Sequence, residues 1–321
     1  MDNPFVTQLK HLAKFVVSIG LCIAIVWVLG PQRMWAALAP ISPATLLAAL
    51  PLMALGVLIT VRRWQVVLDV QGSAIAYPLL LRVYVKGLFF NVLGLGGIGG
   101  YTYRVMVLAR HTGSGGVSAA SVLAERAVDF AALPIIACVG AASFALAAGR
   151  YDAAAVLAGV GVLLTLFLWR VIASGRTLLE HGTEWLWGRP APRFIRDFGG
   201  ALVVLARRPG AIRRLLGLSC LFQAAVILVN YTISWNLGFG ISLIQFVALM
   251  PFVALLVNAA PVALGGLGTT QAAYVYIFRL GDIEAGKALA LSVVITAGVF
   301  VFAAIGGAVL VSERIRLRGM L

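Results

Sequence analysis

The sequence predicts an all-α membrane protein that crosses the bilayer several times. Of its 321 residues, 62% are hydrophobic and only 11% are charged, and the mean hydropathy is +1.02. Soluble domains carry about 25% charged residues, so most of this chain cannot face water. A cytosolic enzyme, a secreted disulfide module and a disordered tail are therefore excluded. Spans of about 20 residues leave room for roughly six to eight crossings.

Six apolar runs mark the predicted full spans: 15–30, 44–61, 127–148, 153–173, 215–237 and 287–311. A cleaved signal peptide is the alternative for the first run. We expect an uncleaved helix instead, because this run is at the long limit for a signal and the rest of the chain is equally apolar.

The positions of arginine and lysine predict the orientation. Lysines precede the first span, Arg62 and Arg63 end the second, and arginines fill segment 174–214 and the tail after residue 313. The turns 31–43 and 149–152 hold one arginine each. Because cytoplasmic loops are enriched in these residues, we expect both termini and segment 174–214 in the cytoplasm, with the protein in the cell inner membrane.

The net charge of +14 indicates contact with anionic lipid headgroups and not with nucleic acid, because the basic residues are sparse and lie at the ends of apolar runs. Three cysteines lie within apolar runs without CxxC spacing, and the three histidines are isolated. We therefore expect neither a metal site nor a disulfide. Glycine patterns near Gly94 and Gly281 lack the strand that a nucleotide site requires, so we expect no cofactor.

Segment 174–214 combines eight arginines with an apolar stripe. Phe194, Phe198, Leu202 and Leu205 recur at helical spacing. This pattern predicts a basic amphipathic helix in the cytoplasmic interface, inside a single domain that comprises residues 1–321.

Two apolar segments, 82–110 and 241–280, are interrupted by glycines. Gly266 follows Gly97 by 169 residues, and similar motifs surround both. The predicted orientation requires the first segment to enter and leave from the cytoplasm and the second from the outer face. The sequence therefore predicts an inverted repeat of two re-entrant helical hairpins, with a site between them near the midplane.

The breaks supply the first candidate site residues. An unwound turn exposes N–H groups and a helix start that suit a phosphate, whereas the alternative is tight helix packing through small residues. The candidates are Gly97, Gly100 and Tyr101 in the first segment, and Gly266, Gly268 and Thr269 in the second.

Charged and amide side chains near the breaks complete the candidate site. Arg104 is expected to face a cavity or a partner, or to snorkel to the interface. Glu125 and Asp129 share a helix face and can pair with it, which leaves Arg126 for a headgroup, although a structural ion-pair network is an equal alternative. Three amides either coordinate a headgroup or bridge helices: Asn91, Asn258 and Gln271.

These motifs resemble the lysylphosphatidylglycerol synthase transmembrane-region family, which includes the flippase-like domain of the multiple peptide resistance factor. The resemblance rests on the two glycine motifs, the flanking asparagines and the pair Glu125-Arg126. It implies a protein that translocates or handles phospholipids or polyprenyl- or hopanoid-type lipids. The family often has Glu where Gln271 stands, which argues against proton coupling there. Aminoacyl-lipid synthesis by this chain alone is not expected.

The leading hypothesis is a flippase-like transporter, not an enzyme, that moves a lipid with an anionic headgroup between leaflets. The alternative is a non-transporting accessory or scaffold subunit of a lipid-modifying enzyme, docked through segment 174–214. A second copy of the chain and such an enzyme are the protein partners that the sequence leaves open. A transferase is a third hypothesis, with only Glu125 and Asp129 as candidate carboxylates.

Overall fold

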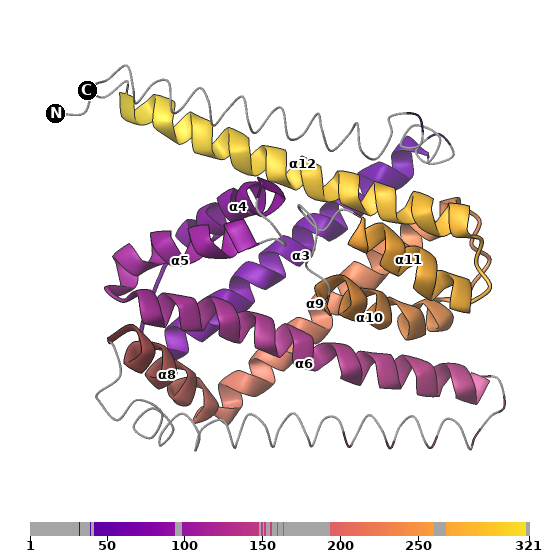
Figure 1. The fold of residues 1–321 in the computed structure, drawn as a ribbon, viewed down its shortest axis with the longest axis horizontal. Coiled ribbons are helices and arrows are strands. Elements are labelled where there is room, and N and C mark those ends of the chain that lie inside the picture. The colour runs from indigo at the N-terminus through magenta and orange to yellow at the C-terminus, as the bar shows by residue number, and fades with distance from the viewer. Residues whose placement is uncertain are drawn as a thin grey trace.

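The computed structural model describes residues 42–93, 98–147, 193–259 and 268–318, with a few single positions between them. These ranges are helical and contain no strand. The helices (Figure 1) are α3 (Pro43–Val70), α4 (Tyr77–Leu93), α5 (Ile98–Thr112), α6 (Gly115–Ala147), α8 (Arg193–Ala206), α9 (Pro209–Asn236), α10 (Leu243–Ala259), α11 (Thr269–Leu280) and α12 (Ala285–Arg318).

Four helices in the described part of the chain are long and apolar enough to cross a membrane, namely α3, α6, α9 and α12. They contain the predicted spans 44–61 and 287–311 and nearly all of 127–148 and 215–237. The predicted spans 15–30 and 153–173 fall outside the ranges given above. The chain is thus a multi-pass membrane protein.

Both glycine-interrupted segments form pairs of short helices. Hairpin 1 consists of α4 and α5, which flank residues 94–97, and hairpin 2 consists of α10 and α11, which flank residues 260–267. The four helices have 17, 15, 17 and 12 residues, fewer than the about 20 that one crossing needs. The two helices of each hairpin pack against each other.

The two hairpins have equivalent neighbours. In hairpin 1, α4 packs against α12 and α5 against α6, whereas in hairpin 2, α10 packs against α6 and α11 against α12. Each hairpin therefore contacts both α6 and α12. In Figure 1, hairpin 1 lies toward the end where α12 finishes and α8 packs, and hairpin 2 lies toward the end where α12 begins.

Close helix contacts depend on glycines in the long helices. A Cβ on Gly306 of α12 would overlap the carbonyl oxygen of Val85 in α4. A Cβ on Gly140 of α6 would lie 2.8 Å from the backbone of Ala248 in α10. Small residues at these crossings let the backbones approach closely, which is a main source of helix association in lipid.

Two apolar cores correspond to the two hairpins. One joins α9, α10, α11 and α12 around the fully buried rings of Phe246 and Phe278. The other joins α3, α4, α5 and α6 around Trp64. Each hairpin thus shares an apolar core with its neighbours in sequence and also packs against a long helix from the other half of the chain.

The described part of segment 174–214 contains α8. Its Leu205 is buried in a cluster with Val67 and Leu215, and its Asp197 accepts a hydrogen bond of 2.5 Å from Ser114, at the turn between α5 and α6. Phe194 remains 52% exposed. Part of the apolar stripe therefore packs on the protein, and an interfacial position for this segment stays a prediction.

Candidate functional site

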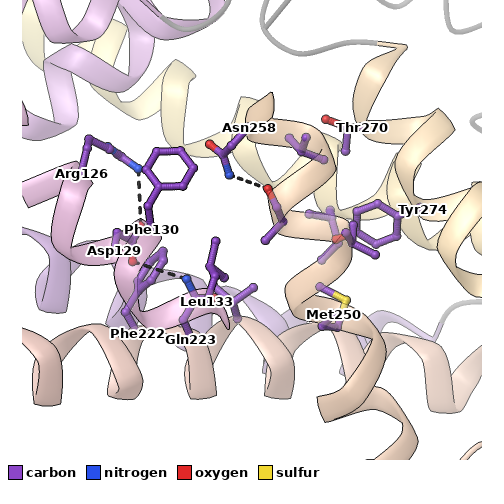
Figure 2. Close-up of a pocket in the computed structure, with 15 residues that line it drawn as sticks. Arg126, Asp129, Phe130, Leu133, Phe222, Gln223, Met250, Asn258, Thr270 and Tyr274 are labelled. Carbon is purple, nitrogen blue, oxygen red and sulfur yellow. Dashed lines mark hydrogen bonds and ion pairs between the residues drawn. The ribbon is translucent and has the colours of Figure 1, made fainter. Parts of the chain in front are cut away.

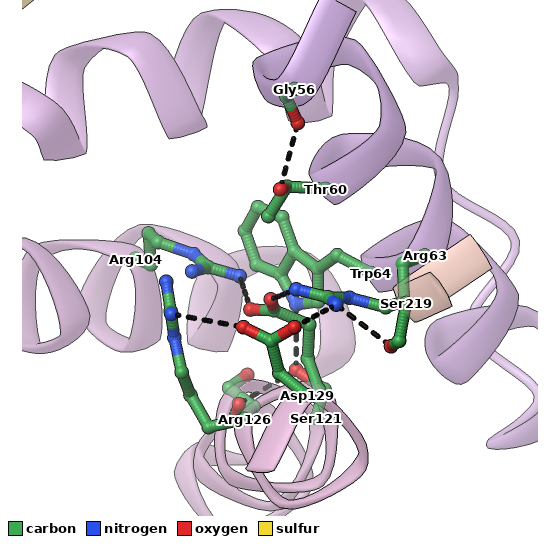
Figure 3. Close-up of polar contacts among 11 residues, drawn as sticks. Gly56, Thr60, Arg63, Trp64, Arg104, Ser121, Arg126, Asp129 and Ser219 are labelled. Atoms are coloured by element: carbon green, nitrogen blue, oxygen red, sulfur yellow. Dashed lines mark hydrogen bonds and ion pairs between the residues drawn. The ribbon is translucent and has the colours of Figure 1, made fainter. Parts of the chain in front are cut away.

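A cluster of charged side chains lies inside the protein, between α3, α5 and α6 (Figure 3). The Arg63 guanidinium donates to Glu125 Oε1 at 2.6 Å and to Asp129 Oδ1 at 2.7 Å. Arg104 donates to the other oxygen of Glu125 at 3.0 Å. Arg63 and Glu125 are fully buried, and Arg104 is 2% exposed. We call these four residues together with Arg126 the ion cluster.

The position of Arg63 corrects the sequence analysis, which placed it with Arg62 at the end of a span. The helix α3 continues to Val70. Because neighbouring residues of a helix point about 100° apart, Arg62 faces outward toward Gln65 while Arg63 faces the ion cluster. The sequence signal was available, since an arginine embedded in a long apolar helix needs a partner at membrane depth.

Aromatic rings hold Arg104 in place. Its guanidinium lies 4.0 Å from the ring centroid of Trp64 and 4.9 Å from that of Tyr84. Trp64 is fixed in turn, because its Nε1–H donates to Ser121 at 3.0 Å. The predicted pairing of Arg104 with Glu125 is confirmed, and these contacts direct Arg104 toward the protein interior.

A cavity of about 250 Å³ opens between α6, α9, α10, α11 and α12 (Figure 2). Most of its wall is apolar, with side chains such as Phe130, Leu133 and Met250. Its polar lining residues are Arg126, Asp129, Gln223, Asn258, Thr270 and Tyr274. The cavity therefore offers both a polar and an apolar surface to a bound ligand.

Arg126 is the cation that lines this cavity, together with Asp129 as the lining anion. Its Nη1 is 3.7 Å from Asp129 Oδ2, beyond hydrogen-bond distance, and its side chain is 24% exposed. The guanidinium lies 5.1 Å from the ring centroid of Tyr101, and its Nε has no hydrogen-bond partner. This Nε is enclosed, so an anion in the cavity would meet the terminal N–H groups of the partly exposed side chain.

Two of the candidate amides stabilise their own hairpins. Asn91 accepts a hydrogen bond of 2.9 Å from the N–H of Gly100, across the break of hairpin 1. Gln271 accepts one of 2.7 Å from the N–H of Gly268 and donates to Thr296 at 3.3 Å. They pair backbone N–H groups that lipid cannot satisfy.

The remaining candidates are dispersed. Asn258 lines the cavity, Gly268 precedes α11 with a φ of 82°, and Thr269 begins that helix. Gly97 and Gly266 lie outside the described residues. The sequence analysis missed Arg63 in the ion cluster and three polar residues of the cavity, Gln223, Thr270 and Tyr274. In the described part of the chain, His, Cys, Asp and Glu form no group that could hold a metal ion.

A comparison with family models places this architecture among known proteins. Residues 12–307 match the model of the lysylphosphatidylglycerol synthase TM region. The chain belongs to this family. The match confirms the resemblance drawn from the glycine motifs, and membership in the lysylphosphatidylglycerol synthase TM family agrees with a lipid-related function in the membrane. Neither the comparison with curated proteins nor that with solved structures gives a match.

Proposed function

We propose that this protein is a flippase-like transporter, not an enzyme, that moves a lipid with an anionic headgroup between the leaflets of the cell inner membrane. The observation that carries the proposal is the position of Arg126, which lines the cavity with a side chain that is 24% exposed and lies beyond hydrogen-bond distance of Asp129. A charged group at membrane depth is costly without a partner, so such a residue marks a substrate site.

The cavity suits the head of an amphiphile. A phosphate can accept two parallel hydrogen bonds from a guanidinium, and the apolar wall favours the first carbons that follow it. Sites for whole drug-sized ligands have about 300–1,000 Å³, so a cavity of about 250 Å³ holds a headgroup while the tails remain in the bilayer.

The arrangement of the helices supports alternating access. Both α3–α6 and α9–α12 follow the order long, short, short, long, and the neighbours of the two hairpins correspond. In the proposed orientation hairpin 1 enters from the cytoplasm and hairpin 2 from the outer face, as in inverted-repeat transporters. Movement of the two hairpins in opposite directions would then expose the headgroup to one side of the membrane at a time.

The test is lipid movement in vesicles that contain the purified protein. Fluorescent phosphatidylglycerol is placed in both leaflets, and a membrane-impermeant quencher reports the fraction that reaches the outer leaflet. We expect rapid movement with the wild type, at least about tenfold slower movement with Arg126→Gln, and wild-type movement with Arg62→Gln. The two variants remove the same charge, but Arg62 lies outside the ion cluster.

Absence of movement for every phospholipid tested would contradict the proposal. In that case the accessory-subunit hypothesis makes the opposite prediction, because charge reversal in segment 174–214 and not Arg126→Gln would abolish the cellular function.

A further inference from the structure

We infer that the cavity selects lipids whose headgroup carries one net negative charge. We infer further that the carboxylate of Asp129 determines which headgroup charge is preferred. The inference rests on the proposed function and deepens it by naming the class of headgroup, a phosphodiester with a single charge.

The charge balance of the ion cluster is the first step. Three guanidinium groups, those of Arg63, Arg104 and Arg126, are in contact with the two carboxylates of Glu125 and Asp129. The cluster therefore carries one net positive charge. Residues 94–97 and 260–267, at the two breaks, add no charged side chain.

Because the ion cluster is buried, its net charge decides which headgroups bind well. An uncompensated charge is unfavourable at membrane depth and in a site with little water. A phosphodiester with one charge neutralises the cluster. A zwitterionic headgroup leaves one positive charge, whereas a phosphomonoester with nearly two charges leaves an excess negative charge. The first class is expected to bind best.

The carboxylates of Glu125 and Asp129 differ in whether they can contact a bound headgroup. Glu125 is fully buried, and its oxygens are held by Arg63 and Arg104. Asp129 lines the cavity. Among the described residues, hydrogen bonds reach only its Oδ1, from Arg63 at 2.7 Å and from Gln223 at 3.4 Å. Its Oδ2 is 3.7 Å from Arg126. Asp129 is thus the anion that competes with a bound phosphate for Arg126.

Removal of the Asp129 carboxylate makes the net charge at the cavity more positive, and a substitution at Asn258 can make it more negative. Asn258 lies across the cavity from Arg126 (Figure 2) and is exposed. Within the described residues, its side chain donates to the carbonyl of Ala254 in its own helix and makes no other hydrogen bond. A carboxylate there adds one negative charge without disturbing the ion cluster. Asn236 makes the same type of bond in α9, to Thr232, and is not among the residues that line the cavity.

The experiment measures which lipid the full chain retains. Delipidated protein is mixed at pH 8 with vesicles of equal parts phosphatidylcholine, phosphatidylglycerol and phosphatidic acid with identical acyl chains, and the bound lipids are identified by native mass spectrometry. Phosphatidic acid supplies nearly two charges at this pH, because the second pKa of a phosphomonoester is about 6.

The variants form a charge series. We expect the wild type to prefer phosphatidylglycerol by about tenfold. Asp129→Asn should shift the preference toward phosphatidic acid, Asn258→Asp toward phosphatidylcholine, and Asn236→Asp should match the wild type. An unchanged order of preference in Asn258→Asp would overturn the inference even if Asp129→Asn did not fold. Retention and movement of none of the three lipids would instead refute the proposed function.

Discussion

Arg63 and Glu125 form a fully buried ion pair of 2.6 Å between residues that are 62 positions apart in the chain. The pair joins α3 to α6, and Arg104 of hairpin 1 shares the same carboxylate. One buried anion thus links two long helices and a hairpin, so the first prediction concerns its removal.

Glu125→Gln should strongly destabilise the protein. The change leaves Arg63 and Arg104 without their shared anion, and the loss of one partner of a buried pair costs about 3–5 kcal/mol. Thermal unfolding in detergent measures the effect. Arg193→Gln is the control, because Arg193 pairs with Asp197 and is 79% exposed, where an ion pair contributes at most about 1 kcal/mol. Equal shifts in the two variants would contradict a structural role for Glu125.

Arg104→Lys should reduce stability without changing lipid preference. Lysine keeps the positive charge, but it cannot place a planar guanidinium against Trp64 and Tyr84 while it donates to Glu125. We expect a loss of about 1–2 kcal/mol. The measurements are thermal unfolding and the retention of phosphatidylglycerol over phosphatidylcholine. A changed lipid preference at unchanged stability would show that Arg104 contacts the headgroup directly, as the sequence analysis expected.

Gly100→Ala should disrupt hairpin 1. A Cβ at this position would overlap Asn91 Oδ1 and the carbonyl oxygen of Gly87, and the backbone oxygen cannot move independently of α4. Gly217→Ala is the matched control, because a Cβ there meets no atom within 4 Å and alanine favours a helix. The yield of monodisperse protein should fall for Gly100→Ala and stay at the wild-type level for Gly217→Ala. Similar yields would mean that α4 and α5 are less closely packed.

The ends of the two hairpins should be accessible from opposite sides of the membrane. Ala74 precedes hairpin 1 and Glu284 follows hairpin 2, and both are exposed. In a background without the native cysteines, Ala74→Cys should react with a membrane-impermeant maleimide only from the cytoplasm, and Glu284→Cys only from outside. Reaction of both from the same side would eliminate the inverted arrangement.

Local composition was enough to locate the helices. The glycine cluster that begins at Gly94 predicted the end of α4, which finishes at Leu93, because glycine is unfavourable within a helix. The pairing of Arg104 with Glu125 was also predictable, since few opposite charges were available in the apolar part of the chain.

The walls of the cavity could not be predicted in the same way. Gln223 and Met250 line the same cavity as Arg126 only because α9 and α10 pack beside α6, and no spacing within one helix contains that information. Arg63 was missed for a different reason. Its neighbour Arg62 made the pair resemble the basic end of a span, and the sequence alone does not show that α3 continues for another two turns.

The contacts of α12 have a mechanical consequence. Near its start, Thr296 accepts a hydrogen bond from Gln271 of hairpin 2. Farther along, Gly306 supports Val85 of hairpin 1, and Glu313 pairs with Lys86. These contacts connect α12 to both hairpins. In the proposed transporter, a tilt of α12 about a pivot between these points would displace the two hairpins in opposite directions, so one motion would open the cavity on one side as it closes it on the other.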